Sequence, residues 1–231
     1  MANNFLSSGK LSFNSLHKLA QRNQLLINIL FVAVILGGGS WYGYRYYSLQ
    51  KEEAATTILD DCLNEYQTAA QGKTSWATVT AMCEAGYEKY KNSGIAPYIL
   101  AVEIDALLHD QKNEEALKVL ERMIASLAHE SPLRAPYQLK YALLKMDMLQ
   151  EKMNDPQFSE AGLQELQALA YDTKNMYADA ALYYLGLYYF SNENEEKARE
   201  VWKTLITNYD THSAELEKSP WVTLAKAKGL V

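Results

Sequence analysis

The side chains best suited to acid–base or metal chemistry near neutral pH are four histidines, His17, His109, His129 and His212. No two of them stand at the i, i+4 spacing that places two ligands on one helix face, and no closely spaced cysteine pair completes a metal site. No serine stands between glycines as a nucleophile elbow requires. The sequence therefore predicts no catalytic, metal or cofactor site, and we expect the chain not to be an enzyme.

Two further motifs invite a chemical interpretation but are better explained as structure. Gln67–Thr74 ends like a phosphate-binding loop, yet Gln67 stands where that loop needs glycine and no strand precedes it. The acidic run Asn192–Glu196 is expected to cap a helix N-terminus, where the helix dipole favours negative charge. Neither motif predicts an active site.

Cys62 and Cys83 are the only cysteines, and a turn predicted around Gly72 lies midway between them. In an antiparallel helix hairpin, residues equidistant from the turn lie side by side. The two α-carbons are then expected within the roughly 4.4 to 6.8 Å that a disulfide requires, and an oxidising compartment would allow the bridge. The alternative is two buried thiols that act as small apolar side chains, and the sequence leaves both open.

The elements that must position these residues begin with an apolar segment, Leu25–Tyr44, in which Asn28 is the only strongly polar side chain. Spanning a bilayer takes roughly 20 apolar residues, and this segment just meets that length. The aromatic residues between Trp41 and Tyr47 suit the headgroup region at its end. We therefore expect a transmembrane helix. A cleaved signal peptide and a buried core helix are the alternatives.

The flanking charges predict the direction of this helix. Lys10, Lys18 and Arg22 precede it and the first acidic residue is Glu52, so the positive-inside rule places the N-terminus in the cytoplasm. The expected organisation is a cytoplasmic tail over 1–24, a transmembrane helix over 25–44 and an exported domain over 45–231. No Asn-x-Ser/Thr glycosylation acceptor is present. The expected location is therefore a bacterial inner membrane, with the C-terminal domain in the periplasm.

Composition and periodicity predict an all-α exported domain. Acidic side chains outnumber basic ones by ten after residue 45, which excludes nucleic acid as an expected partner because phosphate would be repelled. Apolar residues recur at helical spacings, and no segment alternates with period two. The helix of the span is expected to run on over Ser48–Gln71. The further predicted helices are Trp76–Tyr90, Pro97–His109, Asn113–His129, Pro136–Met153, Ser159–Tyr171, Tyr177–Phe190, Glu193–Tyr209 and Pro220–Lys228.

A small-to-large step recurs in two helix pairs. Ala116 is followed four residues later by Leu120, and Ala198 by Trp202, so that a small residue admits a neighbouring helix while the large one fills the space above it. Over 179–212, the residues at tetratricopeptide consensus spacings are Leu182, Leu185, Gly186, Tyr189, Ala198 and Trp202. The unit 97–130 keeps Leu100, Leu107, Ala116 and Leu120, with Glu103 and Ile104 where Leu and Gly are usual. The domain thus resembles a tetratricopeptide-like α-solenoid of helix pairs.

A wider resemblance covers most of the chain. A short tail, one anchor with glycine near its exit, the aromatic and arginine cluster Tyr42–Tyr47 and the tetratricopeptide-like domain together resemble the YfgM-type ancillary subunits of the Sec translocon. This resemblance implies a membrane-anchored periplasmic scaffold beside the SecYEG channel. It would bind the PpiD-type periplasmic chaperone and assist its action on newly exported polypeptides. The alternative is a repeat scaffold that docks a cell-envelope assembly or division enzyme.

The resemblance to tetratricopeptide solenoids also implies binding residues, because the first helix of each pair lines their concave side. Carried over by consensus spacing, the residues are Tyr183, Leu187 and Phe190 in the last unit, and Tyr98, Asp105, Leu108 and His109 in the earlier one. Exposed aromatic side chains are typical of binding hot spots. The alternative is that they pack against the next repeat.

A second binding surface is expected within the membrane. Gly39 and Gly43 stand four residues apart in the predicted span, and small residues at that spacing let two helices approach closely. They predict a packing surface for a partner's transmembrane helix.

Overall fold

The structure is a computed structural model that describes residues 24–151, 156–210 and 219–229, with the side chains of 33–148, 160–210 and 219–229. Within these residues every regular element is an α-helix, which confirms the all-α prediction. The helices are α2 (Gln24–Ala70), α3 (Trp76–Tyr90), α4 (Ala96–His109), α5 (Asn113–Ser126), α6 (Arg134–Glu151), α7 (Pro156–Tyr171), α8 (Ala178–Ser191), α9 (Glu195–Tyr209) and α10 (Pro220–Ala227).

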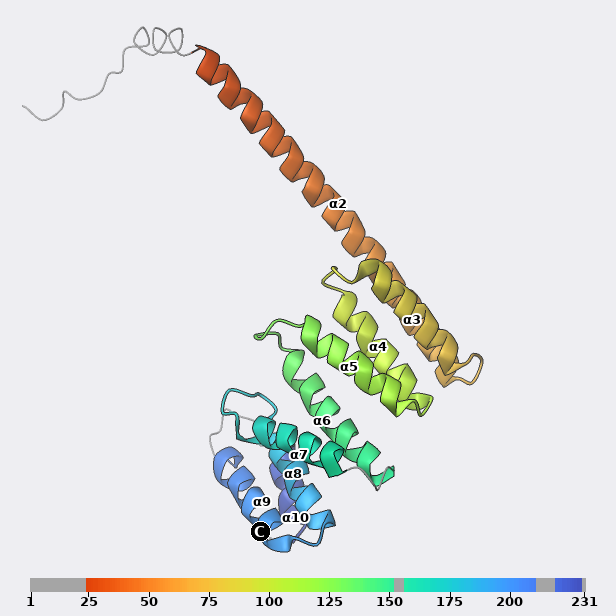
Figure 1. Cartoon of the computed structure of the whole chain (residues 1–231), viewed down its shortest axis with the longest axis vertical. Coiled ribbons are helices and arrows are strands. Elements are labelled where there is room, and N and C mark those ends of the chain that lie inside the picture. Colours follow the sequence, from red (N-terminus) through yellow and green to blue (C-terminus); the bar gives the residue numbers. More distant parts are fainter. Residues whose placement is uncertain (1–23, 152–155, 211–218, 230–231) are drawn as a thin grey trace, which may run out of the picture. The chain divides into compact units, whose positions relative to one another are not determined.

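Helix α2 is unbroken from Gln24 to Ala70, as Figure 1 shows, so the segment after the predicted span does continue it as helix. The chain divides within α2 into two compact units, Met1–Ala54 and Ala55–Val231. Among the residues whose side chains are described, no helix has a stretch both long and apolar enough to cross a membrane. The predicted tail up to residue 23 lies outside the described residues, as do the side chains of 25–32 in the predicted span.

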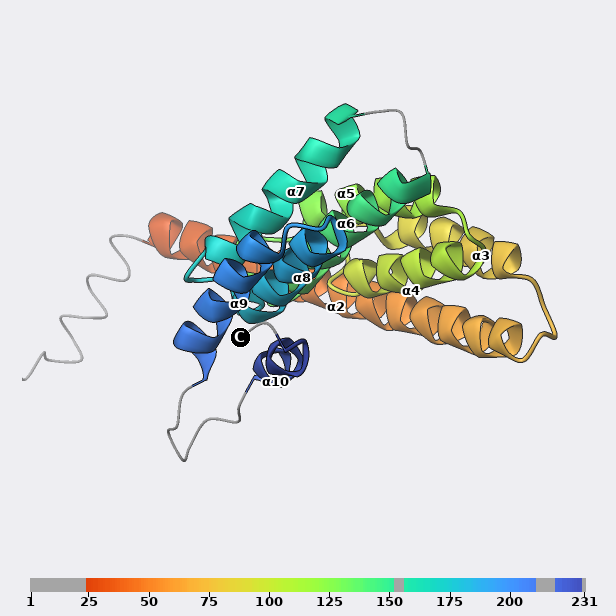
Figure 2. The same ribbon diagram turned by 90° about the horizontal axis from the view of Figure 1, so that it is seen from below.

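The second unit is a stack in which each helix from α3 to α9 packs against the next, and α10 packs against α8 and α9 (Figures 1 and 2). It contains two apolar cores. Residues of helices α2 to α6 form the first core, and residues of helices α6 to α10 form the second. Helix α6 joins them, because Leu144 and Met148 enter the first core whereas Leu139 and Ala142 enter the second. Helices that pack one after the other in chain order are the organisation of an α-solenoid.

One turn recurs between the two helices of a pair, at Gly72, Gln111 and Glu193, each with a φ of 60 to 72°. In each turn the next residue's N–H donates to a carbonyl five residues earlier: Lys73 to Thr68 at 3.1 Å, Lys112 to Leu107 at 2.9 Å and Asn194 to Tyr189 at 2.9 Å. This is the hydrogen-bond pattern of a left-handed helix C-cap. Its repetition identifies α2–α3, α4–α5 and α8–α9 as equivalent pairs.

A second turn recurs between one pair and the next, at Ser93, Ser131 and Asn175. In each turn the side-chain oxygen accepts from the backbone N–H two residues later, at 3.1, 3.4 and 3.0 Å respectively. The next first helix then begins at Ala96, Arg134 and Ala178. The pairs therefore repeat about every 40 residues, longer than the 34 of a tetratricopeptide unit.

The small-to-large step of the last unit is a close helix contact. A Cβ added to Gly186 would lie 2.2 Å from the indole nitrogen of Trp202, which is fully buried and donates to the carbonyl of Tyr183 at 3.2 Å. In the earlier pair, Ile104 and Leu120 hold the equivalent positions and are both fully buried. In α8–α9 the first helix has the small residue and the second the large Trp202, whereas in α4–α5 the first helix has Ile104, larger than glycine, and the second has Leu120, smaller than tryptophan. This exchange of side-chain volume explains why Ile104 replaces the expected glycine.

Local signals set several helix ends. Trp76–Tyr90 was predicted to the residue, and Ser75 caps it by accepting from the Thr78 N–H at 3.2 Å. The prediction that α5 extends to His129 is wrong, because Leu127 is already extended at φ −82°, ψ 136°. The Arg134 guanidinium donates to the carbonyls of Ile124 at 3.1 Å and Leu127 at 2.8 Å, and so closes the helix end.

Candidate protein-binding surface

An aromatic cluster joins α2, α3 and α4 at the start of the second unit. The Tyr66 hydroxyl and the Nε2 atom of His109 share a hydrogen bond of 3.0 Å. The ring of Trp76 stacks on His109 with centroids 4.5 Å apart, and Tyr66 meets the Trp76 ring edge-on at 5.1 Å. The imidazole of His109 is therefore held by two aromatic neighbours in a partly exposed position.

A charged pair continues this surface from α4 to α6. Asp105 forms an ion pair with Lys140. Burial first, then the neighbouring Asp105 and Tyr98, raise the pKa of Tyr137 above its ordinary value, and burial and Asp105 raise the pKa of Tyr66. Asp105 thus lies within electrostatic reach of tyrosines on both flanking helices.

Together these side chains form what we call the first-helix face: Tyr66 on α2, Tyr98, Asp105 and His109 on α4, and Tyr137 and Lys140 on α6. All come from the first helices of three successive pairs. The face offers partly exposed aromatic area, hydrogen-bond donors and acceptors and one pair of opposite charges. Such a mixture suits the binding of a polypeptide segment.

The residues predicted for the earlier unit lie on or beside this face. Tyr98 is 47% exposed and Asp105 pairs with Lys140, whereas Leu108 is half-buried against the first core. Sequence reasoning missed Tyr66 and Tyr137. Their helices lack the clear consensus pattern that placed Tyr98 and Asp105.

The residues predicted for the last unit do not form an exposed set. Tyr183 was expected to line a binding surface, but its side chain is buried. It is 8% exposed, and its ring lies 6.5 Å from Trp202 and 5.3 Å from Trp221 of α10. Helix α10 covers it as a next repeat would. Leu187 is half-buried against the second core, and Phe190 is 38% exposed beside Trp202.

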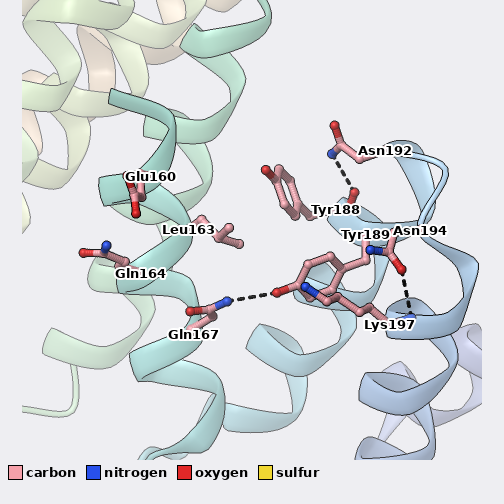
Figure 3. Close-up of a pocket in the computed structure, with 9 residues that line it drawn as sticks. All are labelled: Glu160, Leu163, Gln164, Gln167, Tyr188, Tyr189, Asn192, Asn194 and Lys197. Carbon is pink, nitrogen blue, oxygen red and sulfur yellow. Dashed lines mark hydrogen bonds between the residues drawn. The ribbon is translucent and has the colours of Figure 1, made fainter. Parts of the chain in front are cut away.

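A separate pocket of about 430 Å³ lies between α7 and the α8–α9 turn (Figure 3). Gln167 of α7 donates to the Tyr189 hydroxyl at 2.9 Å, and the Lys197 ammonium lies 5.3 Å from the centre of that ring. Asn194 caps α9 by accepting from the Lys197 N–H at 3.2 Å, as the acidic run predicted. These groups offer hydrogen bonds, and Lys197 and Glu160 add one charge of each sign to the lining.

The remaining chemical candidates are placed as follows. Among the described residues, no three His, Cys, Asp or Glu side chains gather closely enough to hold a metal ion. His129 is exposed, and His17 and His212 lie outside the described residues. Cys62 and Cys83 are both buried as free thiols, so the bridge stays a prediction.

The glycines of the predicted span face open space within the described residues. A Cβ added to Gly39 or Gly43 would meet no atom within 4 Å. The partner helix expected at this surface stays a prediction.

Comparison with known proteins adds no assignment. No protein-family model matches the chain, and no curated protein is similar enough to it to be counted as a relative. The function is therefore inferred from the residues and their arrangement.

Proposed function

We propose that this chain is a membrane-anchored scaffold whose α-solenoid binds protein partners and unfolded polypeptide segments, and that it has no catalytic activity of its own. The first-helix face is the observation that carries the proposal. Tyrosines provide large contact area at a small entropy cost, and the Asp105–Lys140 pair can exchange hydrogen bonds with a peptide backbone. The acidic balance of the domain argues against nucleic acid as an alternative partner.

The proposed anchor is the first part of α2. Val34, Ile35 and Leu36 are 61 to 65% exposed, and the aromatic residues that follow, from Trp41 to Tyr47, are exposed as well. Contiguous apolar surface on a helix is unfavourable in water and indicates a membrane or a protein partner. Lys10, Lys18 and Arg22 favour a cytoplasmic N-terminus, which places the solenoid in the periplasm of an inner-membrane protein.

The resemblance to YfgM-type subunits supplies the proposed partners. These are the SecYEG channel, a PpiD-type chaperone and newly exported polypeptides, with Gly39 and Gly43 as the packing surface inside the membrane. A repeat scaffold that docks a cell-envelope enzyme is the second candidate function.

Photocrosslinking in native membranes separates these proposals. A photoreactive amino acid at Tyr42 reports partners at the membrane, and one at Tyr98 reports partners of the first-helix face. Adducts of Tyr42 with channel or chaperone subunits, and of Tyr98 with chaperone or exported chains, are expected. Tyr177 is the control because it is exposed but lies outside the face.

Two outcomes would argue against the translocon proposal. Adducts with cell-envelope enzymes alone would favour the second candidate. Equal adducts from Tyr98 and Tyr177 would remove the first-helix face from the account.

A further inference from the structure

Helices α2 and α3 approach each other closely beside the two cysteines. A Cβ added to Gly86 of α3 would lie 2.4 Å from the Cγ2 atom of Ile58 of α2. Gly86 lies one helical turn after Cys83, and Ile58 one turn before Cys62. The backbones can approach this closely because Gly86 has no side chain.

The two thiols face each other at this contact. Both are fully buried in the first core, and both are free. The hydrogen-bonding interaction between the two side chains lowers the pKa of Cys62 and raises that of Cys83, and burial raises the pKa of Cys83 further. Their position on opposite sides of the Gly72 turn matches the register of the Ile58–Gly86 contact.

We propose that Cys62 and Cys83 form a redox site, in which thiol–disulfide exchange with a disulfide-bearing oxidant joins α2 to α3 by a covalent bond. The structure describes the reduced form. The proposal concerns the hairpin alone and does not depend on the proposed anchor or on polypeptide binding.

The exchange has two steps. Cys62, as thiolate, attacks one sulfur of the oxidant's disulfide, and the oxidant's other sulfur leaves as a thiolate. Cys83 then loses its proton to solvent and attacks the Cys62 sulfur, which releases the oxidant's second thiolate. The two cysteines lose two electrons and two protons in total, and the oxidant's disulfide becomes two thiols.

Burial controls when this reaction can occur. A fully buried thiol meets an oxidant only when the hairpin opens locally or before the chain has folded. Once formed, the bond opposes that opening and restricts the unfolded chain over a loop of about 20 residues. Oxidation is therefore expected to raise the melting temperature of the second unit by about 5 to 10 °C.

To test this proposal, the full-length chain is unfolded in denaturant and then refolded in detergent, in a buffer that contains oxidised and reduced glutathione. Acid quenching, alkylation under denaturing conditions and intact mass then count the free thiols. We expect no alkylated thiol in the refolded monomer, two after reduction, and the higher melting temperature only in the oxidised form. Cys83→Ser should retain one glutathione on Cys62.

The control is the double variant Cys62→Ala, Cys83→Ala, which should keep its helix signal and melt at the same temperature in either buffer. Two alkylated thiols in a refolded chain with native helix content would overturn the proposal, as would a bond between two chains. A chain that binds polypeptides yet keeps both thiols would refute this proposal while leaving the proposed function intact.

Discussion

At the scale of single residues, the contact of Gly186 with Trp202 leaves no room for a side chain. A Cβ at position 186 would lie within 2.6 Å of three indole atoms, and the indole is rigid and fully buried. Gly186→Ala should therefore destabilise the chain by about 1 to 3 kcal/mol despite alanine's better helix propensity. Urea unfolding followed by circular dichroism measures the change.

Gly162→Ala is the matched control for that substitution. Its Cβ would meet the Cγ atom of Met146 at 3.2 Å, and methionine is flexible enough to move aside. The control should be neutral or stabilising by up to about 1 kcal/mol. Equal destabilisation by both substitutions would contradict the packing account.

Glu103 is a buried acid whose charge is costly. Its side chain pairs with the Arg122 guanidinium at 3.2 Å, and that group lies 4.5 Å from the Tyr87 ring centre. Burial nevertheless outweighs Arg122, with a contribution from Glu84 and Glu88, and raises the pKa of Glu103 to about 7.

This pKa predicts a pH dependence of stability with a definite sign. The folded chain holds the Glu103 proton more tightly than the unfolded chain, so the stability that Glu103 contributes is fully present below its ordinary pKa of 4.5 and is lost as the pH rises through about 7. Relative to Glu103→Gln, wild type should lose on the order of 2 kcal/mol between these pH values and then level off. Urea midpoints of both proteins at several pH values test this. If the difference in stability between wild type and Glu103→Gln stayed constant across this pH range, or changed in favour of wild type as the pH rose, the raised pKa of Glu103 would be refuted.

At the scale of elements, the turns within pairs carry a strained residue in two of three cases. Gly72 suits its φ of 72°, but Gln111 and Glu193 adopt a φ of 60° with a full side chain. Gln111→Gly should relieve this strain and stabilise the chain by about 1 kcal/mol. The expected signature is a melting temperature raised by a few degrees at unchanged helix content.

Gln71→Gly serves as the opposite control. Gln71 precedes Gly72 in the equivalent turn and does not have a positive φ. Glycine there adds freedom to the unfolded chain without relieving strain, so the substitution should destabilise slightly. A destabilising Gln111→Gly would show that the Gln111 side chain makes a contact worth more than the strain.

Helix positions were predictable because their signals are local. Apolar periodicity, the Ser75 cap and the acidic start of α9 each act within one turn of the chain. The burial of Tyr183 was not predictable in the same way, because it depends on Trp221 of a different helix. The partner of Glu103 likewise comes from the next helix, so the spacing that puts Glu103 at a usual Leu position could not predict its ion pair with Arg122.

At the scale of the whole molecule, the stacking of similar helix pairs places their first helices side by side, and these form a continuous surface. Three successive pairs contribute their first helices, α2, α4 and α6, to one face, so residues far apart in sequence, such as Tyr66 and Tyr137, flank the same Asp105. Under the proposed function, an extended polypeptide engages several pairs at once. Its affinity then depends on the tyrosines more than on any single polar contact.

The most direct test of this account measures binding to the first-helix face. The full-length chain in detergent is titrated into a fluorescein-labelled, unstructured peptide of near-neutral charge that contains aromatic residues, and anisotropy gives the Kd. The double variant Tyr98→Ala, Tyr137→Ala should bind about tenfold more weakly or worse, at unchanged helix content. The control Tyr171→Ala, Tyr177→Ala removes exposed tyrosines outside the face and should bind as wild type does. Absence of wild-type binding, or equal affinity of the two double variants, would contradict the account.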